Sequence, residues 1–567
     1  MKIALAQQNY HIGNFEENTR KIIEGIDWAK KQGADLVVFT ELCVCGYPPR
    51  DFLEFNDFIN KCYEAIDKIK EHANEIGVLI GSPARNPQVE GKDLFNAVFL
   101  LYENEIKSEI HKSLLPNYDV FDEYRYFEPA YEWKLMEFKG KKLAVTICED
   151  IWNLGDNPMY RITPMEKLMP MKPDVMINLS ASPYNYAQDV VRNSIVKAHV
   201  LKYKLPMLYC NAVGSQTEIV FDGGSLVYDI NGNKIKEMKY FEEDYAVFDL
   251  DGLCKKNEAA KAAEEAYYYS AKDVGKGVNT LEYLCDEKNI DEIYHALILG
   301  IKDYFGKMGF SKAIIGASGG IDSAVTQVLA VKALGNENVK AVLMPSQYSS
   351  KHSLIDAELL SENLGNCYEI ISIENIFDSF LKELRASFKN LPENVAEENI
   401  QSRIRGNILM AQANKFGYIL LNTSNKSELA TGYGTLYGDM AGGLSVLGDV
   451  YKMQVYALAK YINKETEIIP QHIISKEPSA ELRHGQKDSD TLPEYHQLDR
   501  ILYEYIEQRS GPKEIISKGY DPQLVVKVLK MVNSNEYKRN QFCPIIRVSC
   551  KAFGIGRRVP IVGKYLS

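Results

Sequence analysis

Short runs of β-branched and apolar residues recur through the first half of the chain, with turns and amphipathic stretches between them. The runs that we predict as strands are residues 2–9, 35–41, 78–84, 96–103, 142–150, 174–182, 206–214 and 223–229. Many short strands with a few helical segments between them are typical of a layered α/β domain. We therefore predict such a domain over residues 1–252.

The second half of the chain has a different pattern of predicted helices and strands. Segments with helical periodicity alternate with buried strands, which we predict at residues 312–320, 339–347 and 418–425. This spacing is typical of βαβ units, so we expect a Rossmann-like, doubly wound parallel sheet over residues 290–567. Residues 253–289 would form the linker, because residues 255–283 are rich in Ala, Glu and Lys and predict a surface helix followed by a loop.

Length and charge narrow the class of protein. A chain of 567 residues is too long for one hydrophobic core. Its net charge of -11 disfavours a nonspecific grip on nucleic acid, and we expect no nucleic-acid partner. No run of 18 apolar residues occurs, and the first residues turn polar too early for a secretory signal. We therefore expect a cytoplasmic protein without a membrane partner.

The spacing of the cysteines suggests neither a cysteine-rich metal site nor a set of disulfide bonds. Ten cysteines are scattered through the sequence, and the one close pair, Cys43 and Cys45, falls in an apolar run that looks like a strand. We expect these thiols to be reduced.

A glycine-rich turn follows the strand predicted at residues 312–317. Its sequence is Ser318-Gly319-Gly320-Ile321-Asp322-Ser323, and a helical pattern begins directly after it. Backbone N–H groups at such a turn, together with the helix N-terminus, can hold a phosphate. A simple tight turn is the competing interpretation. The segment lacks the Lys of a Walker A loop, whereas Asp322 could hold a metal ion against bound phosphates.

The hexapeptide resembles the loop of ATP-pyrophosphatases, which split ATP into AMP and pyrophosphate to adenylate a substrate. That superfamily leaves several substrates open, including precursors of guanylate, asparagine, argininosuccinate, modified tRNA and NAD. Three further segments, residues 423–428 (TSNKSE), 432–452 and 475–482 (SKEPSAEL), are similar to the ammonia-using NAD synthetase domain.

This resemblance implies ATP as a co-substrate and Mg²⁺, with no tightly bound organic cofactor. The implied ATP contacts are Gly316, Ala317, Ser318, Gly319, Gly320, Ile321, Asp322, Ser323 and Thr423, with Lys452 and Ser479 near the phosphates. The implied deamido-NAD contacts are Asn399, Glu428, Tyr433 and Lys538, and the implied metal ligands are Asp322 and Glu428. Arg403 and Arg405 are two positions apart, so we expect one at most to reach a phosphate and the other to form an ion pair.

The first half carries a second chemical pattern. Two predicted strands end near Glu41 and Cys148, and Lys112 lies between them in sequence. A thiolate can attack an amide carbon, a carboxylate can move the proton to the leaving amine, and a cation can stabilise the oxyanion. We also expect a nearby Lys to depress the pKa of the Cys148 thiol.

Residues 41–52, 112–127 and 146–152 resemble the three signature segments of the nitrilase, or carbon-nitrogen hydrolase, family in the version fused to NAD synthetase as a glutaminase. The resemblance implies an N-terminal nitrilase-like α-β-β-α sandwich. It makes Cys148 the nucleophile, Glu41 the general base and acid, and Lys112 the oxyanion stabiliser. Tyr118, Ser182 and Gln188 would contact glutamine, although relatives commonly carry Lys at the last position. Glu123 fits a further carboxylate beside the nucleophile.

Together the two resemblances imply that ammonia released from L-glutamine amidates adenylated deamido-NAD, giving NAD, AMP, pyrophosphate and glutamate. They also imply a passage for ammonia and a homo-oligomer, often an octamer. Three alternatives remain open at this point: an ATP-pyrophosphatase acting on another substrate such as tRNA, an amidohydrolase with an inert nucleotide-sensing module, and a purely structural binding protein.

Overall fold

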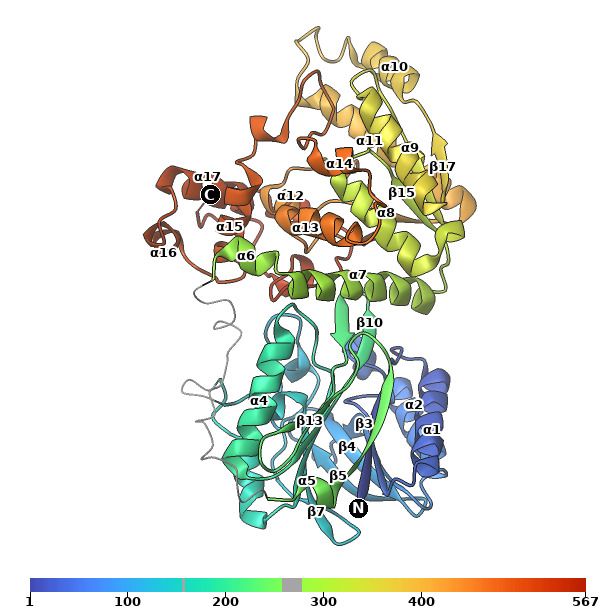
Figure 1. Cartoon of the computed structure of the whole chain (residues 1–567), viewed down its shortest axis with the longest axis vertical. Coiled ribbons are helices and arrows are strands. Elements are labelled where there is room, and N and C mark those ends of the chain that lie inside the picture. Colours follow the sequence, from blue (N-terminus) through green and yellow to red (C-terminus); the bar gives the residue numbers. More distant parts are fainter. Residues whose placement is uncertain (155–158, 257–277, 567) are drawn as a thin grey trace. The chain divides into compact units, whose positions relative to one another are not determined.

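The computed structural model describes residues 1–154, 159–256 and 278–566. The chain forms two compact units, Met1–Val274 and Gly275–Ser567 (Figure 1). Most of the surface helix and loop predicted at residues 255–283 lies outside the described residues.

Two mixed sheets form the centre of the first unit (Figure 1). The first has the order β14-β1-β2-β3-β4-β5 and the second the order β13-β12-β9-β8-β7-β6, and β10 and β11 form a separate hairpin. The strands are β1 (Lys2–Gln7), β2 (Leu36–Val38), β3 (Gly77–Arg85), β4 (Leu94–Tyr102), β5 (Glu105–His111), β6 (Met136–Phe138), β7 (Lys141–Ile147), β8 (Val175–Ser180), β9 (Met207–Asn211), β10 (Val213–Gln216), β11 (Ile219–Asp222), β12 (Leu226–Tyr228), β13 (Lys234–Glu237) and β14 (Asp244–Asp249).

The main core of this unit lies between the two sheets. One face of each sheet contributes to it, for example Leu5 and Val98 from the first sheet with Val145 and Ile177 from the second. The opposite face of the second sheet packs against helices α3 and α4. The helices are α1 (Phe15–Lys31), α2 (Asn56–Lys70), α3 (Pro164–Leu168), α4 (Gln188–Tyr203) and α5 (Leu250–Leu253). With α1 and α2 against the first sheet, the expected α-β-β-α sandwich is confirmed.

The second unit contains a parallel sheet of the order β17-β16-β15-β18-β19. Its strands are β15 (Ala313–Gly316), β16 (Val339–Leu343), β17 (Cys367–Ile370), β18 (Ile419–Asn422) and β19 (Leu444–Ser445). The strand order reverses between β15 and β18, and open α/β sheets bind ligands at the carboxyl ends of the strands beside such a switch point. The expected doubly wound sheet is therefore confirmed, and both predicted motifs, residues 318–323 and 423–428, begin at this edge.

Helices cover both faces of this sheet (Figure 1). On one face Val342 and Ile314 pack against α10 and α11, and on the other Ala341 and Leu343 pack against α9. The helices are α6 (Thr280–Leu284), α7 (Glu287–Met308), α8 (Ile321–Leu334), α9 (Lys351–Leu364), α10 (Glu374–Leu384), α11 (Val395–Phe416), α12 (Lys426–Thr431), α13 (Lys452–Ile462), α14 (Gln471–Ser475), α15 (Tyr495–Ile506), α16 (Pro512–Ser517), α17 (Pro522–Ser534) and α18 (Glu536–Arg539).

Two general expectations can be compared with the structure. In the described part of the chain, every helix is too short or too polar to span a bilayer. All ten cysteines are free thiols. The strand expected around Cys43 and Cys45 is wrong: β2 ends at Val38, and residues 41–45 form turns whose side chains are nevertheless buried.

Two candidate active sites

The predicted nucleophile lies on a strained turn directly after a strand. Cys148 follows β7, begins the short 3₁₀ helix Cys148–Ile151 and has a φ of +40°, a conformation unfavourable for a residue with a Cβ. The carboxylate of Asp150 accepts hydrogen bonds from the backbone N–H groups of Ile147, at 3.0 Å, and of Ser113 and Leu114, at 2.9 Å. Asp150 therefore fixes the turn to the segment that follows Lys112.

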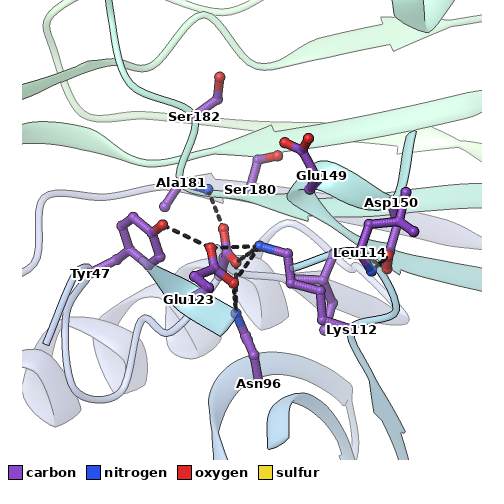
Figure 2. A network of polar contacts seen from close by, with 12 residues as sticks. Tyr47, Asn96, Lys112, Leu114, Glu123, Glu149, Asp150, Ser180, Ala181 and Ser182 are labelled. Atoms are coloured by element: carbon purple, nitrogen blue, oxygen red, sulfur yellow. Dashed lines mark hydrogen bonds and ion pairs between the residues drawn. The ribbon is translucent and has the colours of Figure 1, made fainter. Parts of the chain in front are cut away.

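Lys112 and two carboxylates form a buried charge cluster in the same unit (Figure 2). The Lys112 Nζ atom lies 2.7 Å from Glu41 Oε1 and 2.8 Å from both carboxylate oxygens of Glu123. Lys112, Glu41 and Glu123 are 0%, 2% and 4% exposed. Glu41 lies three residues beyond β2, and Lys112 follows β5 directly, so the ends of different strands bring the predicted groups together.

Neighbouring groups orient both carboxylates, and the sequence analysis did not single them out, although Tyr47 lies within the signature segment 41–52. Asn96 Nδ2 donates to Glu41 Oε1 at 2.8 Å, and the Ala181 N–H donates to Glu41 Oε2 at 3.0 Å. The Tyr47 hydroxyl donates to Glu123 Oε1 at 2.8 Å (Figure 2). A buried carboxylate that accepts several hydrogen bonds has a fixed orientation, as proton transfer requires.

The pKa of the Cys148 thiol differs from the one that the sequence led us to expect. Although Lys112 lowers the pKa of Cys148, burial and the charge of Glu41 outweigh it, and the pKa of the thiol is raised well above its usual value. The expected depression of the Cys148 pKa is therefore wrong. Burial also raises the pKa of Glu123 to about 7, whereas Glu123 and Glu41 outweigh burial and raise the pKa of Lys112. The site thus holds a neutral thiol beside a permanent ammonium.

The residues expected to contact glutamine have defined partners. The Tyr118 hydroxyl donates to the carboxylate of Glu149 at 3.0 Å, and the Tyr160 hydroxyl donates to the same carboxylate at 3.0 Å. The Ser182 N–H donates to Asn211 Oδ1 at 2.9 Å, and Gln188 begins α4 and accepts a bond from Asn185. Glu149 was not singled out from the sequence, although its position directly after Cys148 was a signal.

A pocket of about 300 Å³ lies at the switch point of the second unit. Most of the sequence-predicted residues line it: Gly316, Ala317, Ser318, Gly320, Ile321, Asp322, Ser323, Thr423, Glu428, Tyr433, Lys452 and Ser479. Gly319, Asn399 and Lys538 are not among the lining residues. The Lys538 Nζ atom instead donates to the carbonyls of Gly432 and Gly434, on either side of Tyr433, and Asn399 accepts a bond from Thr435.

The glycine turn is held closely by a neighbouring helix. Gly319 has a φ of +72°, and a Cβ atom on it would lie 2.1 Å from the carbonyl oxygen of Ser353 in α9. Only glycine fits this position, because a side chain meets both an unfavourable φ and a backbone atom. Gly320 is the N-cap residue of α8, so the first backbone N–H groups of this helix lie at the pocket.

Two acidic side chains converge on one lysine in this pocket. The Lys452 Nζ atom lies 2.5 Å from Asp322 Oδ2 and 3.7 Å from Glu428 Oε1, and Asn425 Nδ2 donates to Asp322 Oδ1 at 2.9 Å. Burial and the charge of Asp322 raise the pKa of Glu428 to about 8. Despite burial, Asp322 and Glu428 raise the pKa of Lys452, which remains an ammonium.

The buried carboxylate of Asp499 fixes the two helices that carry these groups. It accepts a hydrogen bond from the Ser427 hydroxyl at 2.5 Å and from the Met453 N–H at 2.8 Å. The same hydroxyl oxygen accepts the Lys452 N–H at 2.9 Å. Asp499 therefore holds the first turn of α13, which begins with Lys452, against α12.

Arg403 and Arg405 form hydrogen bonds with different parts of the second unit. Arg405 lines the pocket and its Nε donates to the carbonyl of Met344, whereas Arg403 Nε donates to the carbonyl of Leu436. The ion pair expected for the second arginine is not found: in the described ranges no carboxylate forms a salt bridge with Arg403.

The pocket suits a hard cation bound together with phosphates. Asp322 and Glu428 supply carboxylate oxygens, the ligand type that Mg²⁺ prefers, and burial together with their mutual repulsion raises the pKa of Glu428. Within the described residues no group of three or more His, Cys, Asp or Glu side chains forms a metal site. Mg²⁺ at phosphate sites commonly uses one or two carboxylates, so this donor set fits it.

The two sites define a chain that joins an amide-hydrolysing unit to an ATP-using unit. The carbon-nitrogen hydrolase family model matches residues 2–256, and the NAD synthase family model matches residues 293–542. Curated relatives include the glutamine-dependent NAD(+) synthetases of Synechocystis sp., 42% identical over 99% of this chain and 98% of the relative, and of Thermotoga maritima, 42% identical over 100% and 99%.

Solved structures agree with these matches. A glutamine-dependent NAD+ synthetase from Acinetobacter baumannii, in complex with ADP, is 38% identical over 99% of this chain and 98% of its own, with a TM-score of 0.74. The fold is also that of a second enzyme, from Cytophaga hutchinsonii, at 19% identity and a TM-score of 0.79 over 100% and 98% of the chains. The chain belongs to the glutamine-dependent NAD(+) synthetase family.

Proposed function

We propose that this enzyme converts deamido-NAD, ATP, L-glutamine and water into NAD, AMP, pyrophosphate and glutamate. The observation that carries the proposal is the presence, in one chain, of a buried Glu–Lys–Cys constellation in the first unit and of a carboxylate-bearing phosphate pocket in the second. We assign residues 1–252 to the glutaminase domain, 253–289 to the linker and 290–567 to the synthetase domain.

In the proposed glutaminase reaction, Cys148 attacks the side-chain amide of glutamine. Because the thiol rests in its protonated form, Glu41 takes the proton as the C–S bond forms. The Lys112 ammonium stabilises the oxyanion, and Glu41 returns the proton to the leaving nitrogen, which departs as NH₃. Glu41 then activates water, which hydrolyses the thioester and releases glutamate.

The substrate would be held by groups around the nucleophile. Tyr118, Ser182 and Gln188 are the proposed glutamine contacts. Glu149 supplies a carboxylate oriented by two tyrosine hydroxyls, and this charge suits the α-ammonium of an amino acid. Asn96 and Tyr47 would keep the two neighbouring carboxylates in position during both proton transfers.

In the proposed synthetase reaction, the carboxylate of deamido-NAD attacks the α-phosphorus of ATP and pyrophosphate leaves. The loop of residues 316–323, the α8 N-terminus, Thr423, Lys452 and Ser479 would bind ATP, and Asn399, Glu428, Tyr433 and Lys538 would bind deamido-NAD. Asp322 and Glu428 would hold Mg²⁺, which neutralises phosphate charge when bound. NH₃ then attacks the acyl-adenylate carbon, the new C–N nitrogen loses a proton to water, and the acyl C–O bond breaks so that AMP departs with its electron pair.

Ammonia needs a sheltered route between the two reactions. In neutral water it is mostly ammonium, which lacks the lone pair needed for attack, and an acyl-adenylate exposed to water hydrolyses. We therefore propose an enclosed passage, in a homo-oligomer of the octameric type implied by the family resemblance.

A nitrogen-labelling experiment tests this proposal. The enzyme is given glutamine with ¹⁵N in the side-chain amide, ATP, Mg²⁺ and deamido-NAD, in a large excess of unlabelled ammonium. Label retained in the NAD amide is the expected result, and NAD carrying only unlabelled nitrogen would refute internal transfer. Asp322→Ala should block synthesis from either nitrogen donor. If wild-type enzyme releases no pyrophosphate, the second unit is a nucleotide sensor instead.

A further inference from the structure

The nucleotide pocket is lined by three cationic side chains, Arg405, Lys452 and Lys476. Lys452 is already paired with two carboxylates, whereas the described part of the chain places no carboxylate within salt-bridge distance of Arg405 or Lys476. A cation withdrawn from water is costly unless an anion compensates it. Arg405 and Lys476 are both half-buried and, among the described residues, lack a direct carboxylate contact, so both are available to an anionic ligand.

The contacts of these two cations place them at different parts of the pocket. Lys476 Nζ donates to Ser353 Oγ at 2.9 Å, and the carbonyl of the same serine packs directly on Gly319 of the glycine turn. Arg405 instead donates to the carbonyl of Met344, beyond the end of β16. That end of the pocket is lined by apolar side chains, Leu343, Met344 and Leu409, which suit a purine ring. Lys476 is thus the unpaired cation on the phosphate-loop side.

Lys476 is held in place before any ligand arrives. It follows α14 directly, and α14 is tied to α9 by a contact of 2.6 Å between His472 Nδ1 and Asp356 Oδ2. The segment after Lys476 is tied to the same helix, because Glu481 accepts the Ser353 hydroxyl at 2.6 Å and the Ser350 N–H at 3.0 Å. Such preorganisation lowers the entropy lost when a ligand binds.

We propose that Lys476 binds the pyrophosphate group of ATP and stabilises it as it leaves. This inference rests on the proposed function and deepens it. When the α-phosphorus–oxygen bond breaks, its electron pair remains on pyrophosphate, whose charge increases. The charge of Lys452 is shared with Asp322 and Glu428, so a second ammonium in the same pocket would add to the stabilisation of the leaving group. Burial lowers the pKa of Lys476, and a bound phosphate would favour the charged form again.

The test compares Lys476→Met and Lys476→Arg with wild-type enzyme, using ammonia as the nitrogen donor so that the glutaminase site does not contribute. Lys351→Met is the matched control, because Lys351 is an exposed lysine at the first position of α9. Inhibition by inorganic pyrophosphate and by AMP is measured for each, together with kcat and the KM for ATP. Thermal unfolding without ligand checks that each variant folds.

In Lys476→Met we expect the inhibition constant of pyrophosphate to rise about 10- to 100-fold, the effect of losing a charge-assisted hydrogen bond, with AMP inhibition changed less than about twofold. The kcat should fall, Lys476→Arg should recover most of both losses, and Lys351→Met should match wild type. Unchanged pyrophosphate inhibition would overturn the proposal, as would equal weakening of AMP and pyrophosphate, which indicates a distorted loop. Wild-type enzyme that forms no pyrophosphate would instead refute the proposed function.

Discussion

Replacing Lys112 with Met separates the structural from the catalytic role of the buried ammonium. Met retains most of the apolar volume but removes the charge that lies 2.7 Å from Glu41 and 2.8 Å from Glu123. Two buried carboxylates then face each other without a cation, and at least one must bind a proton. Breaking a buried ion pair in this way costs about 3–5 kcal/mol of unfolding free energy.

A second variant restores part of the charge balance. Lys112→Met combined with Glu123→Gln removes one carboxylate together with the cation, and we expect it to regain about 1–3 kcal/mol. Glutaminase activity should not return with stability. Loss of an oxyanion-stabilising group costs a factor of about 10²–10³ in kcat, and this loss should persist in both variants.

Both quantities can be measured for the first unit separately. All three tryptophans, Trp28, Trp133 and Trp152, lie in that unit, so urea unfolding followed by tryptophan fluorescence reports on it. Glutamate release gives the glutaminase rate, and ammonia-dependent NAD synthesis serves as the internal control. Glutaminase activity in the double variant within about tenfold of wild type would refute the catalytic role of Lys112. A stability loss below about 1 kcal/mol in the single variant would refute the burial argument.

Three further predictions follow. Cys148→Ala should abolish glutamine-dependent synthesis and change ammonia-dependent synthesis less than about twofold, and NAD formation with each donor measures this. Gly319→Ala should destabilise the enzyme by about 1–3 kcal/mol and raise the KM for ATP, because the new Cβ meets Ser353; unchanged thermal unfolding would contradict that geometry. Burial lowers the pKa of His199 from 6.5 to about 4. Neutral His199 therefore contributes about 3 kcal/mol to the free energy of unfolding above pH 6.5, and this contribution is lost as the pH falls from 6.5 to about 4. His199→Gln should give a shallower fall over that window in fluorescence-detected unfolding, and curves parallel to wild type would be the contrary result.

Much of the fold could be predicted from the sequence because several candidate site residues lie at the ends of predicted strands. The runs around residues 142–150 and 312–320 contain β7 and β15, and chemistry-bearing residues follow both strands. Within one sheet, parallel strands present their carboxyl ends at the same edge, so the motifs that follow the neighbouring strands β15 and β18 predict a shared site. The turn at residues 41–45 misled this approach, since its apolar side chains are buried without belonging to a strand.

The protonation states and the orientations of the site residues could not be predicted from the sequence in the same way. The pKa of Cys148 depends on how far burial outweighs Lys112, and a sequence gives no measure of that balance. Asp499 acts on the synthetase pocket through Ser427, a contact across 72 positions that no local motif encodes. Lys476 lies inside a recognised segment, yet its lack of a carboxylate partner is a property of the fold.

The raised pKa of Cys148 bears on how this enzyme withstands oxidants. Peroxides and alkylating agents react with thiolates, and between turnovers the Cys148 sulfur is protonated and only 5% exposed. Cys367, on the exposed edge strand β17, is the thiol that such reagents would meet first. Damage would thus begin far along the chain from the glutaminase nucleophile, which becomes vulnerable chiefly when Glu41 takes its proton during turnover.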